Sequence, residues 1–201
     1  MKILRLNSSF RGKDSMSFQL GNAIVDKIKR QNPKAEVIIN DLVRNEIPHL
    51  NELHFTAFMT LSENHSDELR EAISHSDKAI KELIAADVLV IDVPMYNFSI
   101  PSSLKAWIDH VVRAGITFKY TENGVEGLIK NKKVFLAIAS GGVYSDGPMK
   151  DLDFTEKYLR NILGFIGITD ITTFRVEGVA IPGIKENSLS KAIQSVQSYN
   201  L

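Results

Sequence analysis

Five short apolar runs recur along the chain, separated by segments with a different periodicity. The runs are rich in Ile, Val, Leu and Phe, and several lack strict alternation of apolar and polar positions. That pattern is typical of strands buried on both faces of a sheet. We predict a strand at each run: KILRLN (2–7), EVIIN (36–40), DVLVIDV (87–93), KVFLAIA (133–139) and DITTFRV (170–176).

Apolar residues at helical spacing fill most of the intervals between these runs. A helix is expected after Pro101, because proline suits the first turn of a helix. Other helices are expected after the first strand and near the C-terminus. Strands that alternate with helices predict an α/β fold, a parallel sheet with helices on both faces, in one domain spanning residues 1–201. One of these helices is predicted over residues 66–86, with one apolar face made of Leu69, Ile73, Ile80, Leu83 and Ile84.

Two long stretches, residues 41–65 and 113–131, show no regular pattern. Long irregular stretches in a compact domain are usually functional or interfacial. The second contains Asn123-Gly124, a turn signal. For the first, two interpretations stay open: a short core helix or an interface, carried by Phe55, Phe58 and Met59.

The composition excludes several classes of protein. Lys and Arg number 24 and Asp and Glu number 24, so no basic excess points to nucleic acid. The absence of cysteine excludes disulfides, thiolate nucleophiles, iron–sulfur clusters and Cys-ligated zinc. No signal-peptide core and no run of about 18 apolar residues occur, so we expect a cytoplasmic protein that does not enter the membrane.

The five histidines show no metal-binding spacing. His65 and His75 lie ten residues apart, which is off a shared helix face, and both are expected on the surface. Trp107 sits among apolar residues at helical spacing and is expected in the core. Because the histidines lack metal-binding spacing and the chain has no cysteine, we predict no metal site.

Three unusual segments follow the first, third and fourth predicted strands. Ligands of an open parallel sheet bind beyond the carboxyl ends of the strands, where the strand order reverses. After the first strand, NSSFRGKDSMS (7–17) offers serine hydroxyls and a helix N-terminus, which together favour an anion. It matches neither G-x-G-x-x-G nor a Walker P-loop. The simpler alternative is that Asp14 or Ser15 only caps the helix.

The other two segments suit a flat ligand. PMYNF (94–98) places large aromatic residues and an amide where a chain usually leaves a strand through small polar residues. In ASGGVYSDGP (139–148), Gly141-Gly142 allows close approach of the backbone to a ligand. A phosphate pocket, an aromatic-and-amide wall and a glycine platform together fit a planar heteroaromatic ring with one phosphate, such as flavin mononucleotide (FMN).

The chain also resembles a known family, the FMN-dependent NADH azoreductases, a flavodoxin-like group within the NAD(P)H:quinone reductases. The resemblance implies a flavodoxin-like five-stranded parallel sheet and a homodimer with one tightly bound FMN per chain at the interface. Its matching stretches are SSFRGKDSMS (8–17), PMYNFSIPSSLKAWIDHVVRAGITFKYTENGVEGL (94–128), SGGVYSDGP (140–148) and LGFIGITD (163–170).

The resemblance also implies which residues bind the cofactor. Two positions depart from the family, which often has Ser and Arg at Ala139 and Ser140, so backbone contacts are expected there. Tyr144 stands where some relatives have His, and Tyr120 is expected to reach the partner's site. The phosphate would be held by Ser9, Ser15, Met16 and Ser17, the ring flanked by Met95, Tyr96, Asn97 and Phe98, and its polar edge contacted by Ala139, Ser140, Gly141 and Gly142.

The implied activity is a ping-pong reduction in which the flavin carries the chemistry and no side chain acts as acid or base. NADH, or NADPH, would donate; quinones would accept two electrons, and aromatic azo bonds would be cleaved to amines in two rounds. The alternative is a flavodoxin-type electron carrier, which usually has a strongly acidic surface; the zero net charge disfavours it. A flavin-free interaction protein is a third possibility, disfavoured by the intact serine turn and PMYNF.

Overall fold

A five-stranded parallel sheet forms the centre of the computed structural model, which describes residues 1–200. The strand order is β2-β1-β3-β6-β7. All five predicted strands are confirmed to within one residue at either end. Their bounds are β1 (Lys2–Asn7), β2 (Glu36–Asp41), β3 (Val88–Pro94), β6 (Lys133–Ala139) and β7 (Asp170–Val176).

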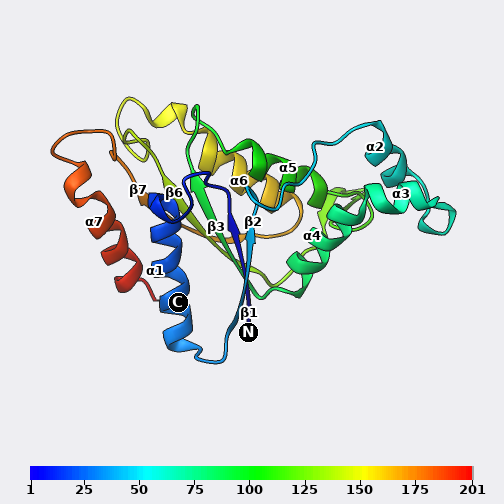
Figure 1. Cartoon of the computed structure of the whole chain (residues 1–201), viewed down its shortest axis with the longest axis horizontal. Helices are drawn as coiled ribbons and strands as arrows, with labels where there is room; N and C mark the ends of the chain where they lie inside the picture. The colour runs from blue at the N-terminus through cyan, green and yellow to red at the C-terminus, as the bar shows by residue number, and fades with distance from the viewer. Residues whose placement is uncertain (201) are drawn as a thin grey trace.

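Helices cover both faces of this sheet, as predicted (Figure 1). On one face lie α1 (Met16–Gln31) and α7 (Lys185–Ser198), which bury one apolar cluster. On the other face α4 (Ser74–Ala85), α5 (Ser102–Val111) and α6 (Phe154–Phe165) bury a second. Trp107 of α5 is fully buried in that second cluster, so its assignment to the core is confirmed.

Several small elements lie outside the central sheet. The Asn123-Gly124 signal lies at a hairpin between β4 (Phe118–Thr121) and β5 (Gly124–Gly127), in which Glu122 and Asn123 form the turn and Gly124 begins β5. The helices α2 (Glu52–Met59) and α3 (Asp67–Ala72) lie at one end of the molecule, beyond α4 (Figure 1). Three 3₁₀ turns complete the described elements: η1 (Gly12–Asp14), η2 (Ser62–Asn64) and η3 (Lys150–Leu152).

Helix α2 is the short helix of the first interpretation, but its apolar residues divide between the surface and the interior. Phe55 and Met59 are 66% and 73% exposed, so they are not core residues, whereas Phe58 is half-buried, with its ring centroid 6.4 Å from that of His110. His54 and Ala57 face inward instead. The interface interpretation stays a prediction.

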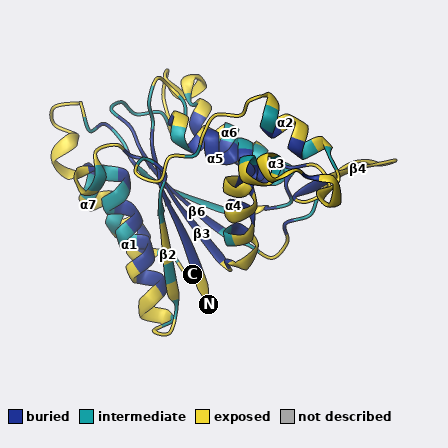
Figure 2. Cartoon of the chain, turned by 45° about the vertical axis from the view of Figure 1, so that its right-hand side comes forward, coloured by how far each residue is buried: buried dark blue, intermediate teal, exposed yellow. Residues whose placement is uncertain are grey.

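Strand β2 is not buried on both faces, which corrects the prediction from its apolar run. It lies at the edge of the sheet and pairs only with β1. Ile38 and Ile39 are 43% and 56% exposed. Figure 2 shows β2 largely in the colours of exposed and intermediate residues, whereas β3 and β6 are buried. Composition alone did not distinguish an edge strand from a central one.

The continuous helix predicted over residues 66–86 is also wrong. It divides into α3 and α4 at Ile73, whose ψ of 0° ends the first helix in a tighter turn. Ile84 is exposed because Leu83, the adjacent residue, faces the core, and neighbouring helix positions point about 100° apart.

One histidine prediction is confirmed and one is wrong. His75 is exposed, as expected. His65 is buried, with Nε2 at 2.9 Å from the carbonyl oxygen of Ala57 and 3.0 Å from that of Thr60. The ring satisfies the carbonyls at the end of α2, a role that sequence spacing does not reveal.

Candidate functional site

The three segments singled out in the sequence meet at the carboxyl edge of the sheet. In the strand register Asn7 lies opposite Asp92, so β1 and β3 end side by side. Pro94 lies opposite Ala139, and the N–H of Met95 donates to the carbonyl of Ala139 at 2.7 Å. The order β2-β1-β3 places the topological switch point between β1 and β3.

The first segment forms an anion-binding cradle at the N-terminus of α1. Ser9, Ser15 and Ser17 are buried, and the hydroxyls of Ser15 and Ser17 lie 2.9 Å apart. Ser15 occupies the N-cap position but makes no side-chain hydrogen bond to the first turn, and that turn holds no acidic residue. Asp14 lies in η1. The simple capping alternative is therefore not supported, and the first-turn N–H groups are oriented for an anion.

PMYNF folds into a tight turn with both central residues in the left-handed region. Tyr96 and Ser99 exchange two backbone hydrogen bonds of 3.0 Å each. Between them Asn97 and Phe98 have φ of 50° and 67°, the pattern of a type I′ turn. A left-handed phenylalanine is strained, and such strain concentrates at functional sites. The turn presents the amide and the ring of these residues at the sheet edge, both exposed.

The glycine segment is held by the chain that follows β7. The carbonyls of Ser140, Gly141 and Gly142 accept from the N–H groups of residues 179, 180 and 178. The Ser140 hydroxyl donates to the Gly142 carbonyl at 2.9 Å, so this buried side chain is satisfied internally. A Cβ at Gly141 would meet only Ala180, at an ordinary 3.5 Å. Packing within the protein does not require glycine at 141, which fits a platform for a ligand.

Phe10 belongs to the site, although the sequence analysis did not single it out. Its ring stacks on Tyr96 with centroids 4.5 Å apart and an interplanar angle of 21°. Ser9 Oγ lies 3.5 Å from the Tyr96 hydroxyl, so two contacts join the serine loop to the PMYNF turn. The one signal was an aromatic residue inside an otherwise polar loop.

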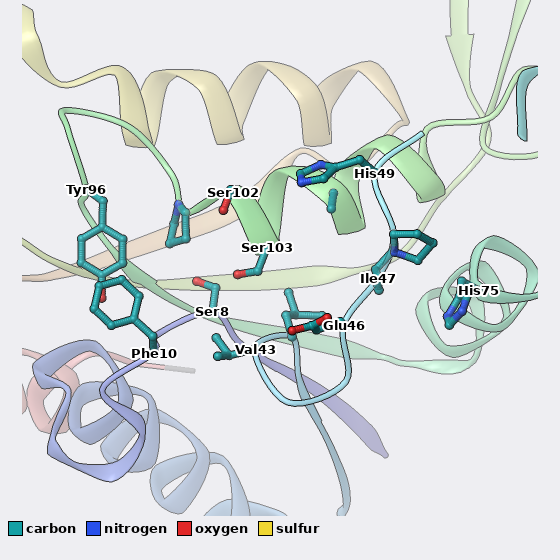
Figure 3. A pocket seen from close by; sticks show the side chains of 14 residues that line it. Ser8, Phe10, Val43, Glu46, Ile47, His49, His75, Tyr96, Ser102 and Ser103 are labelled. Atoms are coloured by element: carbon teal, nitrogen blue, oxygen red, sulfur yellow. The ribbon is translucent and has the colours of Figure 1, made fainter. Parts of the chain in front are cut away.

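Beside the stacked rings lies a cavity of about 660 Å³ (Figure 3). Ser8, Phe10 and Tyr96 line one end, and Ser102 and Ser103 of α5 line its wall. Figure 3 shows the two rings lying against each other at one end of the cavity, with His75 at the other. The site therefore opens to a space large enough for a flat organic molecule.

Glu177, just after β7, is a second residue that the sequence analysis missed. Its Oε1 accepts the N–H groups of Tyr144 and Ser145 at 2.8 and 2.9 Å. Glu177 thereby holds the backbone of Tyr144, whose ring lies edge-on to Phe98 with centroids 6.2 Å apart. Because Glu177 lies over thirty residues away along the chain, no local pattern could reveal this role.

A buried carboxyl lies directly behind the serine loop. Asp92 of β3 is fully buried, and burial raises its pKa to about 7, although the adjacent Arg5 guanidinium opposes that shift. The Asp92 backbone carbonyl accepts the Ser8 hydroxyl at 2.7 Å. Asp92 therefore contacts the binding loop through its backbone carbonyl, while its carboxylate accepts from Arg5.

Tyr120 is not brought into the three loops: it lies on the β4–β5 hairpin and is 74% exposed. Among residues 1–200, no group of three or more potential ligands could hold a metal ion, and no helix is long and apolar enough to cross a membrane.

A doubly wound parallel sheet with an anion-binding loop, an aromatic turn and a glycine loop at its switch point defines a nucleotide-binding α/β protein. More particularly, the chain belongs to the flavodoxin-like fold family, whose model matches residues 1–199.

Known proteins similar to this chain extend over almost its whole length. "FMN-dependent NADH:quinone oxidoreductase" from Herminiimonas arsenicoxydans is 48% identical over 180 residues, 90% of this chain and 88% of the relative. The protein of the same name from Beijerinckia indica subsp. indica is 44% identical over 195 residues, 97% and 96% of the two chains. The crystal structure of an FMN-dependent NADH-azoreductase from Bacillus anthracis in complex with FMN has a TM-score of 0.86 at 25% identity, covering 98% of each chain.

Proposed function

We propose that this protein is an FMN-dependent NADH:quinone oxidoreductase that also cleaves aromatic azo bonds. The observation that carries the proposal is the uncapped N-terminus of α1 with its buried serines, which lies beside the PMYNF turn and the glycine loop. A similar protein, 48% identical, is named for FMN, NADH and quinone, and a structural neighbour is an azoreductase in complex with FMN.

The residues at the sheet edge fit FMN. Buried hydroxyls and first-turn N–H groups with no neighbouring acid suit a phosphate dianion. We assign the phosphate to Ser9, Ser15, Met16 and Ser17. The turn Met95, Tyr96, Asn97 and Phe98 and the backbone of Ala139, Ser140, Gly141 and Gly142 would flank the ring.

When bound, FMN supplies two-electron transfer between NADH and a quinone or azo acceptor, with NADPH as a further candidate donor. The chain's own contribution is binding, orientation and electrostatics. The backbone N–H groups of Asn97, Phe98, Gly141 and Gly142 would stabilise negative charge at the ring's polar edge, as an oxyanion hole does. The aromatic rings at one end of the 660 Å³ cavity would stack flat acceptors and exclude water.

A homodimer and a cytoplasmic location are further parts of the proposal. Phe55, Met59 and Tyr120 are more than 60% exposed, and exposed apolar side chains of this size suit an interface with a second copy. Sedimentation velocity at micromolar concentration tests this: a monomer would exclude the dimer. The cytoplasmic location stays a prediction from the sequence.

The experiment that tests the function is an absorption spectrum of the purified protein followed by anaerobic addition of NADH. A yellow protein that bleaches with NADH and recovers with benzoquinone supports the reductase. A colourless protein that takes up no added FMN excludes it. A yellow protein that reacts with neither NADH nor NADPH favours the electron carrier.

The phosphate assignment is tested separately with Ser9→Ala/Ser17→Ala. We expect FMN to bind at least tenfold more weakly, because two donors to a charged group are lost. Ser188→Ala is the matched control, since Ser188 is also a buried serine but bonds within α7. Unchanged FMN affinity in the double variant would exclude this assignment.

A further inference from the structure

A buried ion pair lies between β1 and β3, directly behind the serine loop. Arg5 is 3% exposed and Asp92 is fully buried. Asp92 Oδ2 accepts from Arg5 Nε at 2.9 Å and lies 2.8 Å from Nη2. Ile3, Val88 and Val90 of these two strands belong to the apolar cluster that α1 and α7 bury. Two charged residues therefore stand where that apolar row would be expected to continue.

Arg5 fixes the beginning of α1. Its Nη1 donates to Asn22 Oδ1 and its Nη2 to the carbonyl of Phe18, both at 2.6 Å. Its guanidinium also lies 4.2 Å from the centroid of the Phe18 ring. Because the planar fork engages several acceptors at once, it sets both the position and the rotation of the first two turns.

Asp92 fixes the beginning of the serine loop. Its backbone carbonyl accepts from the N–H of Ser8 at 3.4 Å and from the Ser8 hydroxyl at 2.7 Å. The next residue, Ser9, donates its N–H to Asn7 Oδ1 at 3.2 Å. The backbone of Asp92 thus holds the beginning of segment 8–18, Arg5 holds its end, and the ion pair joins the two residues.

Burying this ion pair in the core carries a large free-energy cost of desolvation. Asp92 Oδ1 is buried and makes no hydrogen bond to any of residues 1–200, and burial raises the Asp92 pKa to about 7. Replacing a buried pair with apolar residues of similar volume is often neutral or stabilising. Stability of the fold therefore does not explain the pair, whereas the precise position of the loop does.

We propose that Arg5 and Asp92 are positioning residues that hold segment 8–18 in the geometry that binds the phosphate of the cofactor. The inference rests on the proposed function, since the anion at the α1 N-terminus is taken to be the FMN phosphate. Neither side chain needs to touch the cofactor. Asp92 orients the Arg5 guanidinium, and the effect passes through Phe18 and Asn22 to the hydroxyl and N–H donors that precede them.

The test compares two ligands that differ only in the phosphate, FMN and riboflavin, titrated by flavin fluorescence. In Arg5→Met/Asp92→Leu we expect the Kd of FMN to rise about tenfold or more, and that of riboflavin to change less than about twofold. A thermal melt establishes that the variant is folded. Arg70→Met/Asp67→Leu, which removes an exposed ion pair on α3, is the matched control and should change neither Kd.

If the double variant does not fold, Asp92→Asn decides, because it keeps the shape and the backbone carbonyl while removing the charge. Its FMN-to-riboflavin preference should fall in the same direction. Equally weaker binding of FMN and riboflavin, or an unchanged preference for FMN, would overturn the positioning role. A wild-type protein that binds no FMN would instead overturn the proposed function, so the two failures are distinguishable.

Discussion

Phe10 and Tyr96 stack with their ring centroids 4.5 Å apart, although Phe10 is 68% exposed and comes from a different loop. An exposed ring gains little from burial, so its position is set by the partner ring. The stack joins the serine loop to the PMYNF turn at one end of the cavity (Figure 3). The two halves of the site therefore act as one unit.

Phe10→Ala should lower the free energy of unfolding by about 0.5–1.5 kcal/mol, because the stacking interaction is lost. Urea unfolding measures this. Phe154→Ala is the control: Phe154 is 52% exposed and stacks on no aromatic ring among residues 1–200. Equal losses in the two variants would show that the stack contributes nothing.

Gly21→Ala should destabilise the protein by about 1–3 kcal/mol or more, because the added methyl overpacks the core. A Cβ there would lie 1.8 Å from Asp92 Oδ1 and 2.9 Å from Arg5 Nη2. Gly164→Ala in α6 is the matched control: nothing lies within 4 Å of its Cβ, so we expect a gain of about 0.5–1 kcal/mol.

A double-mutant cycle identifies the cause of the Gly21→Ala effect. In an Asp92→Ala background the same change should cost at least about 1 kcal/mol less, since the clashing carboxylate is absent. Additive costs would mean that the helix, and not Asp92, resists the methyl group.

The stability of the protein should depend on the titration of Asp92. Its pKa is about 7 when folded, against about 3.9 in an unfolded chain, so the folded state binds more protons between these values. This contribution is complete below about pH 4 and is lost as the pH rises through 7, with a slope of at most about 1.4 kcal/mol per pH unit.

Urea unfolding between pH 5 and 8 checks this contribution as the difference between wild type and Asp92→Asn. The subtraction matters because burial lowers the pKa of His110, which makes stability fall as the pH drops toward acid. Asp26→Asn, an exposed carboxylate on α1, should leave the curve unchanged. Parallel wild-type and Asp92→Asn curves would contradict the prediction.

Lys27→Met should cost about 1–3 kcal/mol, because three backbone carbonyls lose a charged donor. The buried Lys27 Nζ donates to the carbonyls of Val196 at 2.8 Å and Gln197 at 2.6 Å, and also to that of Tyr199. These groups end α7, so the lysine fixes that helix against α1. Thermal melts measure the effect, and the exposed Lys29→Met should show almost none.

Much of the site was predictable because its signals are local. Each of the serine loop, PMYNF and the glycine pair follows a strand directly, and parallel strands end at one edge. Phe10 and Glu177 were missed because their roles depend on partners over thirty residues away along the chain. The predictions that His65 lies on the surface and that Ile38 and Ile39 are buried were also wrong, since burial depends on neighbours in space.

The sequence by itself determined the five strands, the alternation with helices and the three loops, because periodicity and turn chemistry act over a few residues. Only the tertiary structure decided that β2 lies at the edge, that the helix breaks at Ile73, and that Arg5 meets Asp92 beneath α1. Those outcomes depend on packing between segments distant in sequence. A lone arginine and a lone aspartate in two apolar strands carry no sign of each other until the strands pair.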